Sequence, residues 1–472
     1  MIKKEEIFNN LPNFNFDKEK LQEELDIEIK KNNKKIIVLD DDPTGTQTTH
    51  DLKIYTNLSQ ESLENGFDDE NNCFFILTNS RSFTKEKTKD YHQKIAKNIA
   101  KVSKEKDKDF ILISRSDSTL RGHYPIETKV LKETIEKESG ESFDGEILIP
   151  FFKEGKRYTI DDEHYVEEAG FLKKAQDTEF AKDRTFSYKS SNLYEYIEEK
   201  TEGEYKKENI VSISLEELRN ADLESIENKL LKVENFNKVF VNAEDYWDIK
   251  VFVLALYRVL DRKRFIFRTA ASFVREVAGV KERGLLTHDE LIENNQYGGI
   301  IAIGSHTEKT TKQLENIKEF KDIEFIEFNS DLADNVEKFN EEINNIIKKE
   351  NELIKSGKSV AIYTKRKYFS KYNDTREDEL IRSVRISKGL AKIVGSLEIN
   401  PSFVVAKGGI TSSDVATDSL NLKFANVIGQ IHPGVPVWRS PKDSKYPNIP
   451  LVIFPGNVGD ENSLKESIEK LM

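Results

Sequence analysis

The stretch IIVLDDDPTGTQTT, residues 36–49, decides the fold that this sequence predicts. Four apolar residues, mostly β-branched, run directly into three aspartates, Asp40 to Asp42. A short apolar run of this kind is typical of a strand that is buried on both faces, as in a parallel sheet. Pro43 and Gly45 then end the strand and turn the chain. Ligands of open α/β sheets bind beyond the carboxyl ends of strands, so these carboxylates lie where a polar ligand or a metal would bind. An acidic turn that caps a helix is the structural alternative.

The same pattern of a short apolar run followed by a polar loop recurs along the chain. In the first half, further strands are expected over residues 73–77, 110–113, 146–149, 239–242 and 265–267, with a helix of mixed charge over residues 85–106. In the second half, strands are expected over residues 299–303, 324–328, 359–363, 403–405 and 451–454. Strands that alternate with amphipathic helices are the signature of βαβ units. The sequence therefore predicts an α/β protein with two domains, each built on a mainly parallel sheet.

Two changes in composition mark the predicted domain boundaries. Residues 1–33 are mostly charged and are expected to form an N-terminal helical extension. After Glu276 the sequence contains several glycines and no clear period, which indicates a connection between domains. The predicted domains therefore span residues 34–285 and residues 298–472.

Composition argues against several classes of function. The net charge is −12, which is unfavourable for a protein that binds the phosphate backbone of nucleic acids. Cys73 is the only cysteine, so an intrachain disulfide and a cysteine-rich metal site are excluded, and a reducing compartment is expected. No apolar run approaches the roughly 20 residues of a membrane span, and the N-terminus lacks the apolar stretch of a signal peptide. We therefore expect a cytoplasmic protein without nucleic-acid or membrane partners.

Polar loops of the predicted first domain combine arginines with aspartates. They contribute Arg81, Arg115, Arg121, Asp41, Asp42 and Asp117, and a fourth such loop contains Lys156 and Arg157. If the strands are parallel neighbours, these loops open at one sheet edge, where guanidinium groups bind a carboxylate and aspartates accept hydrogen bonds from hydroxyls. The pattern suits a small polyhydroxylated acid, although a lone arginine is more often a solvated ion pair. His123 and His164 are expected to be structural, and no spacing predicts a zinc site.

Three glycine-marked loops follow strands of the predicted second domain. Gly304 and Ser305 lie at a strand-to-helix turn, KGGITSSD covers residues 407–414, and FPGNVGD covers residues 454–460. Glycine lets backbone N–H groups approach phosphate oxygens, and Lys407 could neutralise phosphate charge. One such loop could simply close a tight turn, but three on neighbouring strands favour nucleotide binding. Neither GxxxxGK[ST] nor an early GxGxxG occurs, which argues against a P-loop NTPase and a simple NAD enzyme.

Together, these loops resemble the four-carbon acid sugar kinase family. The resemblance rests on DDPTG (residues 41–45), SRSDSTLRG (114–122), PFFKEGKRYT (150–159), GSHT (304–307), KGGITSSD (407–414), PGVPVW (433–438) and PGNVGD (455–460). It spans most of the chain, from about residue 34 to the end, and keeps the order of the elements. Each motif alone is weak, but the combination is specific.

The resemblance implies an enzyme that uses ATP to phosphorylate a four-carbon sugar acid such as threonate, erythronate or an oxo form. It implies that the first domain holds the sugar acid, the second holds the nucleotide, and the active site lies in the interdomain cleft. On the sugar side it implies Asp41, Asp42, Thr44, Arg81, Arg115, Asp117, Ser118 and Arg121. On the ATP side it implies Ser305, Lys407, Gly408, Gly409, Thr411, Gly456 and Asn457. The chain departs from many members at GGIT, where they have a GGET-type sequence, and at Pro43, where they have an aliphatic residue.

The predicted mechanism is phosphoryl transfer by positioning and charge neutralisation. The arginines clamp the carboxylate, while an aspartate, Asp42 with Asp117 as second choice, orients the hydroxyl and accepts its proton. Lys407 and the amides of Gly408 and Gly409 stabilise the phosphates, and Mg²⁺ bridges phosphate oxygens with few protein ligands. The metal ligands, the stereochemistry of the acid and the oligomeric state, a homodimer included, stay open at this stage.

Two other functions compete with a kinase. Asp40, Asp42 and Thr44 fit the DxDxT motif of haloacid dehalogenase phosphatases, with Asp40 as nucleophile, Asp42 as general acid/base and Thr78 as the second motif. That alternative leaves the SRSDSTLRG loop and the glycine-rich loops unexplained. The second alternative is a non-catalytic sugar-acid-binding protein, which would bind its ligand without consuming ATP.

Overall fold

The computed structural model describes residues 2–293, 296–367, 376–456 and 458–472, and the chain folds as two compact units. The first unit comprises the chain up to Asp41 together with residues 57–282. The second unit comprises residues 42–56 together with residues 283–472. The segment that follows the first strand therefore folds with the second unit, although the chain on both sides of it belongs to the first.

The first unit contains a sheet whose neighbouring strands all run parallel. In spatial order these strands are β10 (Val211–Ile213), β11 (Asn237–Val241), β6 (Gly145–Ile149), β12 (Phe265–Thr269), β5 (Phe110–Arg115), β2 (Lys35–Asp40) and β4 (Cys73–Leu77). Every residue of β2, β4, β5 and β6 is buried, as expected for parallel strands covered on both faces. The strands predicted in this half are therefore confirmed.

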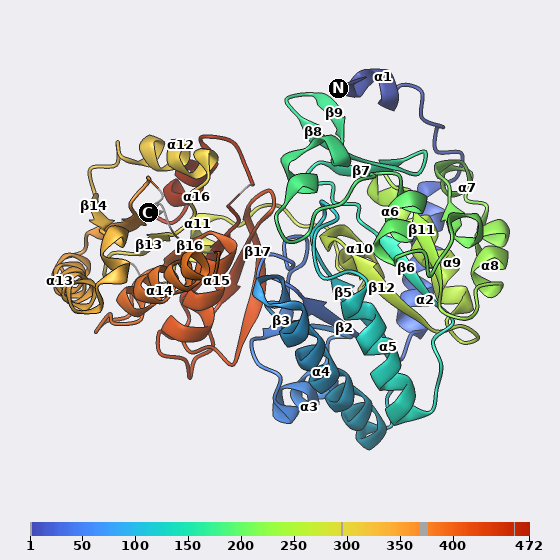
Figure 1. The fold of residues 1–472 in the computed structure, drawn as a ribbon, viewed down its shortest axis with the longest axis horizontal. Coiled ribbons are helices and arrows are strands. Elements are labelled where there is room, and N and C mark those ends of the chain that lie inside the picture. Colours follow the sequence, from blue (N-terminus) through green and yellow to red (C-terminus); the bar gives the residue numbers. More distant parts are fainter. Residues whose placement is uncertain (1, 294–295, 368–375, 457) are drawn as a thin grey trace. The chain divides into compact units, whose positions relative to one another are not determined.

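Ten α-helices of the described residues belong to the first unit. They are α1 (Lys4–Phe8), α2 (Lys18–Lys31), α3 (Gln60–Asp68), α4 (Lys85–Lys106), α5 (Ile126–Ser139), α6 (Leu193–Lys200), α7 (Leu215–Arg219), α8 (Leu223–Leu231), α9 (Tyr246–Val259) and α10 (Ala271–Val277). α4 has the predicted bounds, because the Thr84 side chain caps its first turn and Asp107 ends it in a left-handed conformation. α4 and α5 lie side by side (Figure 1).

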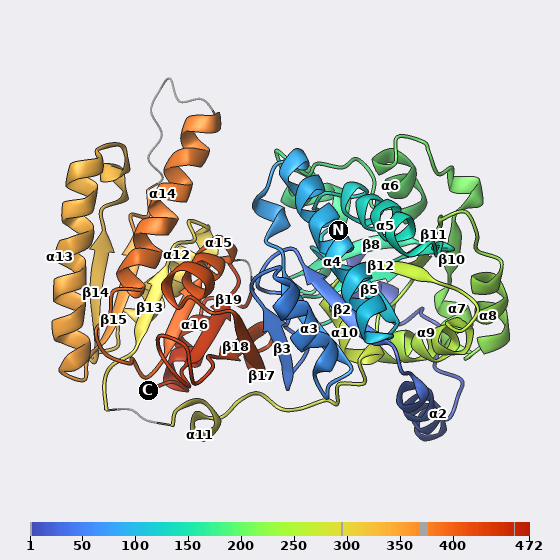
Figure 2. The ribbon, with the colours of Figure 1, turned by 90° about the horizontal axis from the view of Figure 1, so that it is seen from below.

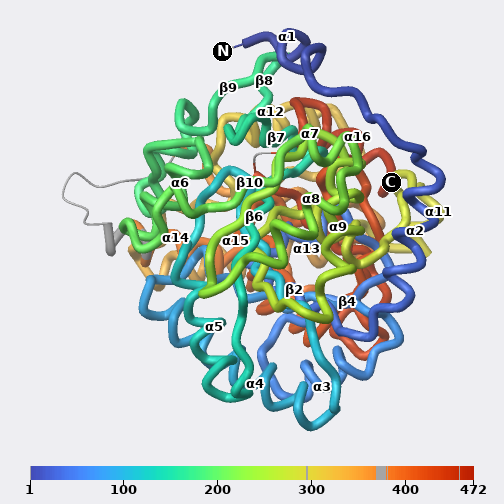
Figure 3. The backbone as a smooth tube through the Cα atoms, turned by 90° about the vertical axis from the view of Figure 1, so that its right-hand side faces the viewer, coloured from blue at the N-terminus to red at the C-terminus, as the bar shows by residue number. Residues whose placement is uncertain are grey.

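A small antiparallel sheet also belongs to the first unit. Its order is β1 (Ile2–Lys3), β9 (Phe171–Lys174), β8 (Glu163–Glu168) and β7 (Arg157–Ile160), so the chain's first residues return to pair with its middle (Figure 3). Asp161 and Asp162 both have positive φ, 49° and 66°, and form the tight turn between β7 and β8. These strands were not among the predicted ones, because they are short and contain charged residues in place of a continuous apolar run.

The strands of the second unit form two parts, one parallel and one antiparallel. Their order is β14 (Ile323–Phe328), β15 (Ser359–Thr364), β13 (Ile300–Ile303), β16 (Val404–Lys407), β19 (Pro450–Phe454), β18 (Val435–Arg439), β17 (Phe424–His432) and β3 (Leu52–Tyr55). Strands from β14 to β19 pair in parallel, and β18, β17 and β3 extend the sheet antiparallel. Together the two units confirm the predicted α/β fold with mainly parallel sheets.

The segment over residues 42–56 is fastened to the second unit by buried contacts. β3 pairs with β17, from Leu52 opposite Val427 to Tyr55 opposite Phe424. Before it, the indole Nε1 of fully buried Trp438 donates to Thr46 Oγ1 at 2.9 Å. These contacts explain why the aspartate run is divided, with Asp41 in one unit and Asp42 in the other.

Helices of the second unit flank its parallel strands. They are α11 (His288–Leu291), α12 (Glu308–Ile317), α13 (Val336–Lys355), α14 (Arg376–Val394), α15 (Gly409–Asp414) and α16 (Ser463–Glu469), with a π-helical turn, η6 (Val415–Ser419), directly after α15. α13 and α14 pack against each other, and α13 also contacts β14 and β15 (Figure 2). In the described part of the chain, no helix combines the length and the hydropathy that a membrane span requires.

Glu350 on α13 is a buried acid that leads to a stability prediction. Its side chain is fully buried, and neither carboxyl oxygen has a hydrogen-bond partner among the described residues. Burial raises its pKa from an ordinary 4.5 to about 9, because the charged form loses its hydration. The folded state thus holds a proton that the unfolded chain releases above pH 4.5. Its contribution to stability is complete below that pH and is lost as the pH rises towards 9.

Glu350→Met is therefore expected to stabilise the protein increasingly as the pH rises from 5.5 to 8.5. The difference in unfolding free energy should grow by at most about 1.4 kcal/mol per pH unit. Urea unfolding at three pH values measures it, with Glu352→Met, at an exposed position on the same helix, as the control. A difference that does not change with pH would show that Glu350 ionises normally.

Candidate functional site

An ion-pair cluster lies where β2 and β5 end. The parallel register places Asp40 beside Arg115, and Arg115 Nε lies 2.7 Å from Asp40 Oδ1. Arg115 Nη1 also lies 3.3 Å from Asp41 Oδ1. All three side chains are at least 95% buried, so these pairs are only weakly screened by water. Arg115 is thus held by carboxylates of the protein itself.

Arg81 reaches the same aspartate from the loop after β4. It lies in a short 3₁₀ turn, η1 (Ser80–Ser82). Its Nη2 donates to Asp41 Oδ1 at 2.7 Å and its Nε to Asp41 Oδ2 at 3.0 Å, which is a bidentate pair. Asp41 therefore orients two of the predicted arginines and is largely neutralised by them.

Asp117, in the loop after β5, holds the third predicted arginine. Arg121 Nε donates to its Oδ2 at 2.9 Å, and Arg121 Nη2 to its Oδ1 at 3.3 Å. The backbone N–H of Thr119 donates to Oδ2 at 3.1 Å, and Arg81 Nη1 lies 3.7 Å from Oδ1. Burial would raise the pKa of Asp117, but Arg121, Arg81 and these hydrogen bonds outweigh it and hold the pKa well below its usual range. A carboxylate stabilised in this way is a weak proton acceptor.

Ser118 and the two histidines are placed by hydrogen bonds of this loop. His164 Nε2 is 2.8 Å from Ser118 O, and its Nδ1 is 3.0 Å from Thr159 Oγ1. Burial lowers the pKa of His164 to about 4, so the ring is neutral at pH 7. His123 Nε2 is 3.0 Å from Phe83 O. Both histidines are buried and hydrogen-bonded, as expected for structural residues.

Asp42 lies next to this cluster in the chain but has a different environment. The backbone N–H of Thr44 donates to Asp42 Oδ1 at 2.8 Å, and the Thr44 hydroxyl bonds to the same oxygen, which is the geometry of an Asx turn. Carboxylate oxygens of Asp40, Asp41 and Asp42 lie within 4.8 Å of one another. Oxygen donors suit Mg²⁺, but Asp40 and Asp41 already pair with arginines. Two of the three carboxylates are therefore already engaged by arginines of the protein.

The geometry does not fit a haloacid dehalogenase phosphatase. Asp40, the nucleophile in that alternative, is fully buried and paired with Arg115 Nε. The hydroxyl of Thr78, its second motif, donates to the backbone oxygen of Asp40 at 2.9 Å and thereby joins β4 to β2. A nucleophile must be open to a phosphate ester, and Asp40 is not.

Three glycine-marked loops of the second unit meet around Ser305. They follow β13, β16 and β19, whose carboxyl ends share one sheet edge. Gly408 has φ of +119°, and a Cβ there would lie 3.3 Å from Ser305. A Cβ at Gly456 would lie 3.0 Å from Ser305 Oγ, and one at Gly304 would lie 2.1 Å from Thr411 Oγ1. A side chain at any of these three glycines would therefore be crowded, and their absence lets the backbone of the three loops come close together around Ser305.

Hydroxyl groups at the start of α12 line the same small volume around Ser305, which we call the Ser305 corner. Thr307 caps the helix by accepting from Thr310 N at 3.2 Å, and its own hydroxyl donates to Gly456 O at 3.1 Å. Thr310 Oγ1 donates to Ser305 Oγ at 3.0 Å. A helix N-terminus with hydroxyls and closely approaching backbone is a typical place for a phosphate. Gly409 opens α15 beside this corner, whereas Asn457 lies outside the described residues.

Lys407 is the last residue of β16, and it lies in the strand where the sequence analysis expected a loop. Its side chain is fully buried; Nζ donates to Pro455 O at 3.0 Å and lies 4.0 Å from the Phe454 ring centre. Burial, followed by the charges of Lys309 and Arg366, holds its pKa well below the usual value. Among the described residues it forms no ion pair with an acid, which is unusual for a buried lysine.

Arg366 is a cation of this corner that the sequence analysis did not name. It follows β15, whose carboxyl end lies beside that of β13. Its Nη2 donates to Ser305 O at 2.6 Å and to Thr311 Oγ1 at 3.2 Å, and its buried Nη1 has no hydrogen-bond partner among the described residues. The sequence signal that could have identified Arg366 is the pair Lys365-Arg366 after the strand predicted over residues 359–363, but such a pair resembles a run of solvated charges.

Ile410 occupies the position where the resemblance expects an acid. It is 55% exposed, directly after Gly409. No carboxylate is therefore supplied at this point of α15, and a metal near the phosphates would have to find its ligands elsewhere.

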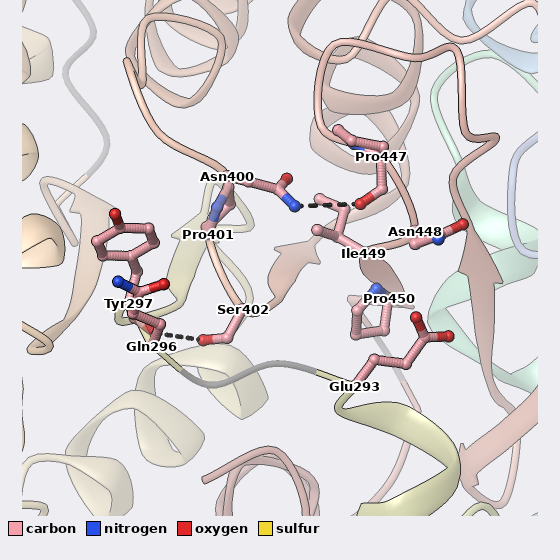
Figure 4. Close-up of a pocket in the computed structure, with 10 residues that line it drawn as sticks. All are labelled: Glu293, Gln296, Tyr297, Asn400, Pro401, Ser402, Pro447, Asn448, Ile449 and Pro450. Atoms are coloured by element: carbon pink, nitrogen blue, oxygen red, sulfur yellow. Dashed lines mark hydrogen bonds between the residues drawn. The ribbon is translucent and has the colours of Figure 1, made fainter.

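A pocket of about 230 Å³ in the second unit lies away from this corner (Figure 4). Its lining includes Pro450, the first residue of β19, and Ser402, which precedes β16. Asn400 Nδ2 donates to Pro447 O at 3.1 Å across it, and Ser402 Oγ donates to Tyr297 O at 2.7 Å. The pocket is at the amino ends of the strands, whereas ligands of such sheets bind at the carboxyl ends, so we do not assign the nucleotide to it.

Comparisons with known proteins indicate one sugar-binding and one nucleotide-binding domain. Residues 36–277 match a family model described as a sugar-binding N-terminal domain, and residues 300–464 match one described as a nucleotide-binding C-terminal domain. No curated protein matches the sequence significantly.

Two crystal structures have the same fold. The Haemophilus influenzae protein HI1011, of the family DUF1537, is 16% identical with a TM-score of 0.60, over 92% of this chain and 100% of that chain. A Salmonella typhimurium LT2 protein, provisionally described as a tRNA synthase, is 13% identical with a TM-score of 0.65, over 92% of this chain and 98% of that chain. At these identities the likeness concerns the fold alone. With more than half of its length matched by the sugar-binding model and the nucleotide-binding model following it, the chain belongs to the four-carbon acid sugar kinase family.

Proposed function

We propose that this protein is an ATP-dependent kinase that phosphorylates a hydroxyl of a small sugar acid, of the threonate, erythronate or oxo-tetronate class. The observation that carries the proposal is the pair of cations in the nucleotide-binding domain, Lys407 and Arg366. Both are buried or half-buried, and neither has an acidic partner among the described residues. Cations left uncompensated in this way favour a ligand rich in negative charge.

On the sugar side, we assign the proton-accepting role to Asp42. Asp117 is held by Arg121 and Arg81, and its low pKa makes it a poor acceptor. Asp42, whose carboxylate accepts the Thr44 N–H in the turn after β2, is the other aspartate that the sequence offers for this role. A base must lie within hydrogen-bond reach of the hydroxyl that attacks the phosphate. The ion pairs of Asp41 with Arg81 and with Arg115 then hold the aspartate run in place.

On the nucleotide side, charge stabilisation would come from backbone groups and cations. The amide of Gly409, the hydroxyls of Ser305 and Thr411, and Lys407 are assigned to the phosphates. The N–H of Gly408, which the sequence also suggested, donates to Phe454 O at 2.9 Å instead. Mg²⁺ bound with the nucleotide would supply charge neutralisation, and the grouped carboxylates of Asp40, Asp41 and Asp42 are oxygen donors that could hold it.

The activity is tested by an ATP-consumption screen with Mg²⁺ and a panel of threonate, erythronate and oxo-tetronates. We expect ADP formation that depends on one acid of the panel, with a phosphorylated acid identified by ³¹P NMR and mass spectrometry. Acid binding without ADP formation would favour a sugar-acid-binding protein. Hydrolysis of a generic phosphate ester without ATP would favour a phosphatase.

Arg366→Gln is expected to weaken ATP binding by about tenfold, because a guanidinium that contacts a phosphate is worth ~1.5 kcal/mol or more. Calorimetric titration with ATP measures it without any turnover. Lys365→Gln is the matched control, since it removes the same charge one residue earlier and Lys365 already pairs with Asp331. If Arg366→Gln and the unmodified protein bound ATP with equal affinity, the role of Arg366 would be only to stabilise the loop after β13.

A further inference from the structure

Arg157 is an arginine close enough to Asp117 to interact with its charge, and it has no role in the proposed function. It begins β7 in the small antiparallel sheet. Its backbone is fixed by two bonds to Phe152, N–H to O at 2.9 Å and O to N–H at 3.0 Å. The residue is half-buried, and its Nε atom is fully buried.

Arg157 and Arg121 lie against the same aromatic ring. The guanidinium carbon of Arg121 is 4.8 Å from the Phe180 ring centre, and that of Arg157 is 5.9 Å from it. Both arginines also sense the charge of Asp117. Phe180 thus orients two guanidinium groups towards the loop that follows β5.

The two arginines differ in how they are compensated. Arg121 forms a bidentate pair with Asp117, and its Nη1 lies 3.5 Å from Asp183 Oδ2. Arg157 forms no ion pair with any described residue, and its buried Nε has no hydrogen-bond partner there. Burial lowers the pKa of Arg157, and Asp117 and Glu168 offset that effect only in part. The site therefore contains a cation that its own carboxylates do not satisfy.

We infer that Arg157 binds the carboxylate of the substrate and is the residue that selects a sugar acid over a neutral sugar. Arg81, Arg115 and Arg121, the arginines that the sequence suggested for this task, are already occupied by Asp40, Asp41 and Asp117. A planar guanidinium with free donors matches a carboxylate in two hydrogen bonds, and partial burial strengthens them. The inference rests on the proposed function, because it assumes that the acid binds in this domain.

The experiment is calorimetric titration of the full chain with threonate, with threitol as the uncharged analogue and with inorganic phosphate, all without nucleotide. The variants are Arg157→Gln, Arg157→Lys and the control Lys156→Gln. Lys156 is exposed, precedes Arg157 directly and carries the same charge. Circular dichroism and melting curves establish that each variant is folded.

Arg157→Gln should weaken threonate binding by about tenfold or more and leave threitol binding unchanged, because only the acid offers a charged acceptor. Arg157→Lys keeps the charge but loses the planar fork, so it should recover only part of the affinity. It also carries the test if the glutamine variant does not fold. Lys156→Gln should bind threonate like the unmodified protein.

Three outcomes would overturn the inference. The first is an unchanged threonate affinity in Arg157→Gln, which would limit Arg157 to packing on Phe180. The second is equal affinity of the unmodified protein for threonate and threitol, and the third is inorganic phosphate binding that depends on Arg157 while threonate binding does not. A different result would contradict the proposed function itself. In that case the unmodified protein would bind none of threonate, erythronate and the oxo-tetronates, which none of the three outcomes above requires.

Discussion

Asp42→Asn is expected to lower kcat by about two orders of magnitude or more while KM for both substrates changes little. The substitution removes the negative charge that would accept the proton of the attacking hydroxyl. It keeps Oδ1, the atom that accepts the hydrogen bond from Thr44 N–H at 2.8 Å, so the turn after β2 should persist. Steady-state kinetics with the acid identified in the screen, together with a melting curve, provides the measurement.

Asp117→Asn separates this role from a structural one. Asp117 bonds Arg121 in two places and lies near Arg81, so its loss should release those arginines and act on acid binding or on stability. We therefore expect KM for the acid or the melting temperature to change more than kcat. The reverse pattern, in which Asp117→Asn abolishes turnover of a folded protein and Asp42→Asn does not, would transfer the base role to Asp117.

The strands and their polar ends could be predicted from the sequence because both are local patterns. Buried parallel strands consist of continuous apolar runs, so β2, β4 and β5 were recognisable. The division of the aspartate run between two units was not, because it depends on β3 pairing with β17, nearly 370 residues later in the chain. Local patterns say that a segment forms a strand, not which sheet it joins.

The partners of the charged residues were also beyond local patterns. Arg115 appeared to be a ligand-binding residue, but the register of β2 and β5 places Asp40 beside it. Arg157 was part of a polar loop and of a family motif but had no role assigned, and Arg366 lies between two lysines, which is typical of a solvated charge run. Whether an arginine is satisfied depends on carboxylates that are distant in sequence, and only the three-dimensional arrangement identifies these.

Lys407→Met is expected to change nucleotide affinity and stability in opposite directions. ATP binding should weaken by about thirtyfold or more, because the variant loses a buried charge that would face the phosphates. The ligand-free protein should melt at the same or a higher temperature, because a buried ammonium with one carbonyl partner and no acid costs more than an apolar side chain of similar size. Calorimetry and melting curves on one preparation give both quantities. The matched control is Lys312→Met, at an exposed lysine of α12 that pairs with Glu461.

Proton uptake gives a second, independent readout of the same residue. Since burial holds the pKa of Lys407 well below its usual value, part of the ligand-free protein carries a neutral amine where an ordinary lysine is still charged. A bound triphosphate favours the charged form, so ATP binding should take up protons and tighten as the pH falls towards neutrality. Titrations in two buffers with different ionisation enthalpies measure this uptake, which Lys407→Met should abolish and Lys312→Met should not. If Lys407→Met instead lowered the melting temperature and bound ATP with unchanged affinity and proton uptake, Lys407 would be a brace between β16 and Pro455. The charge for the phosphates would then have to come from Arg366 and the backbone alone.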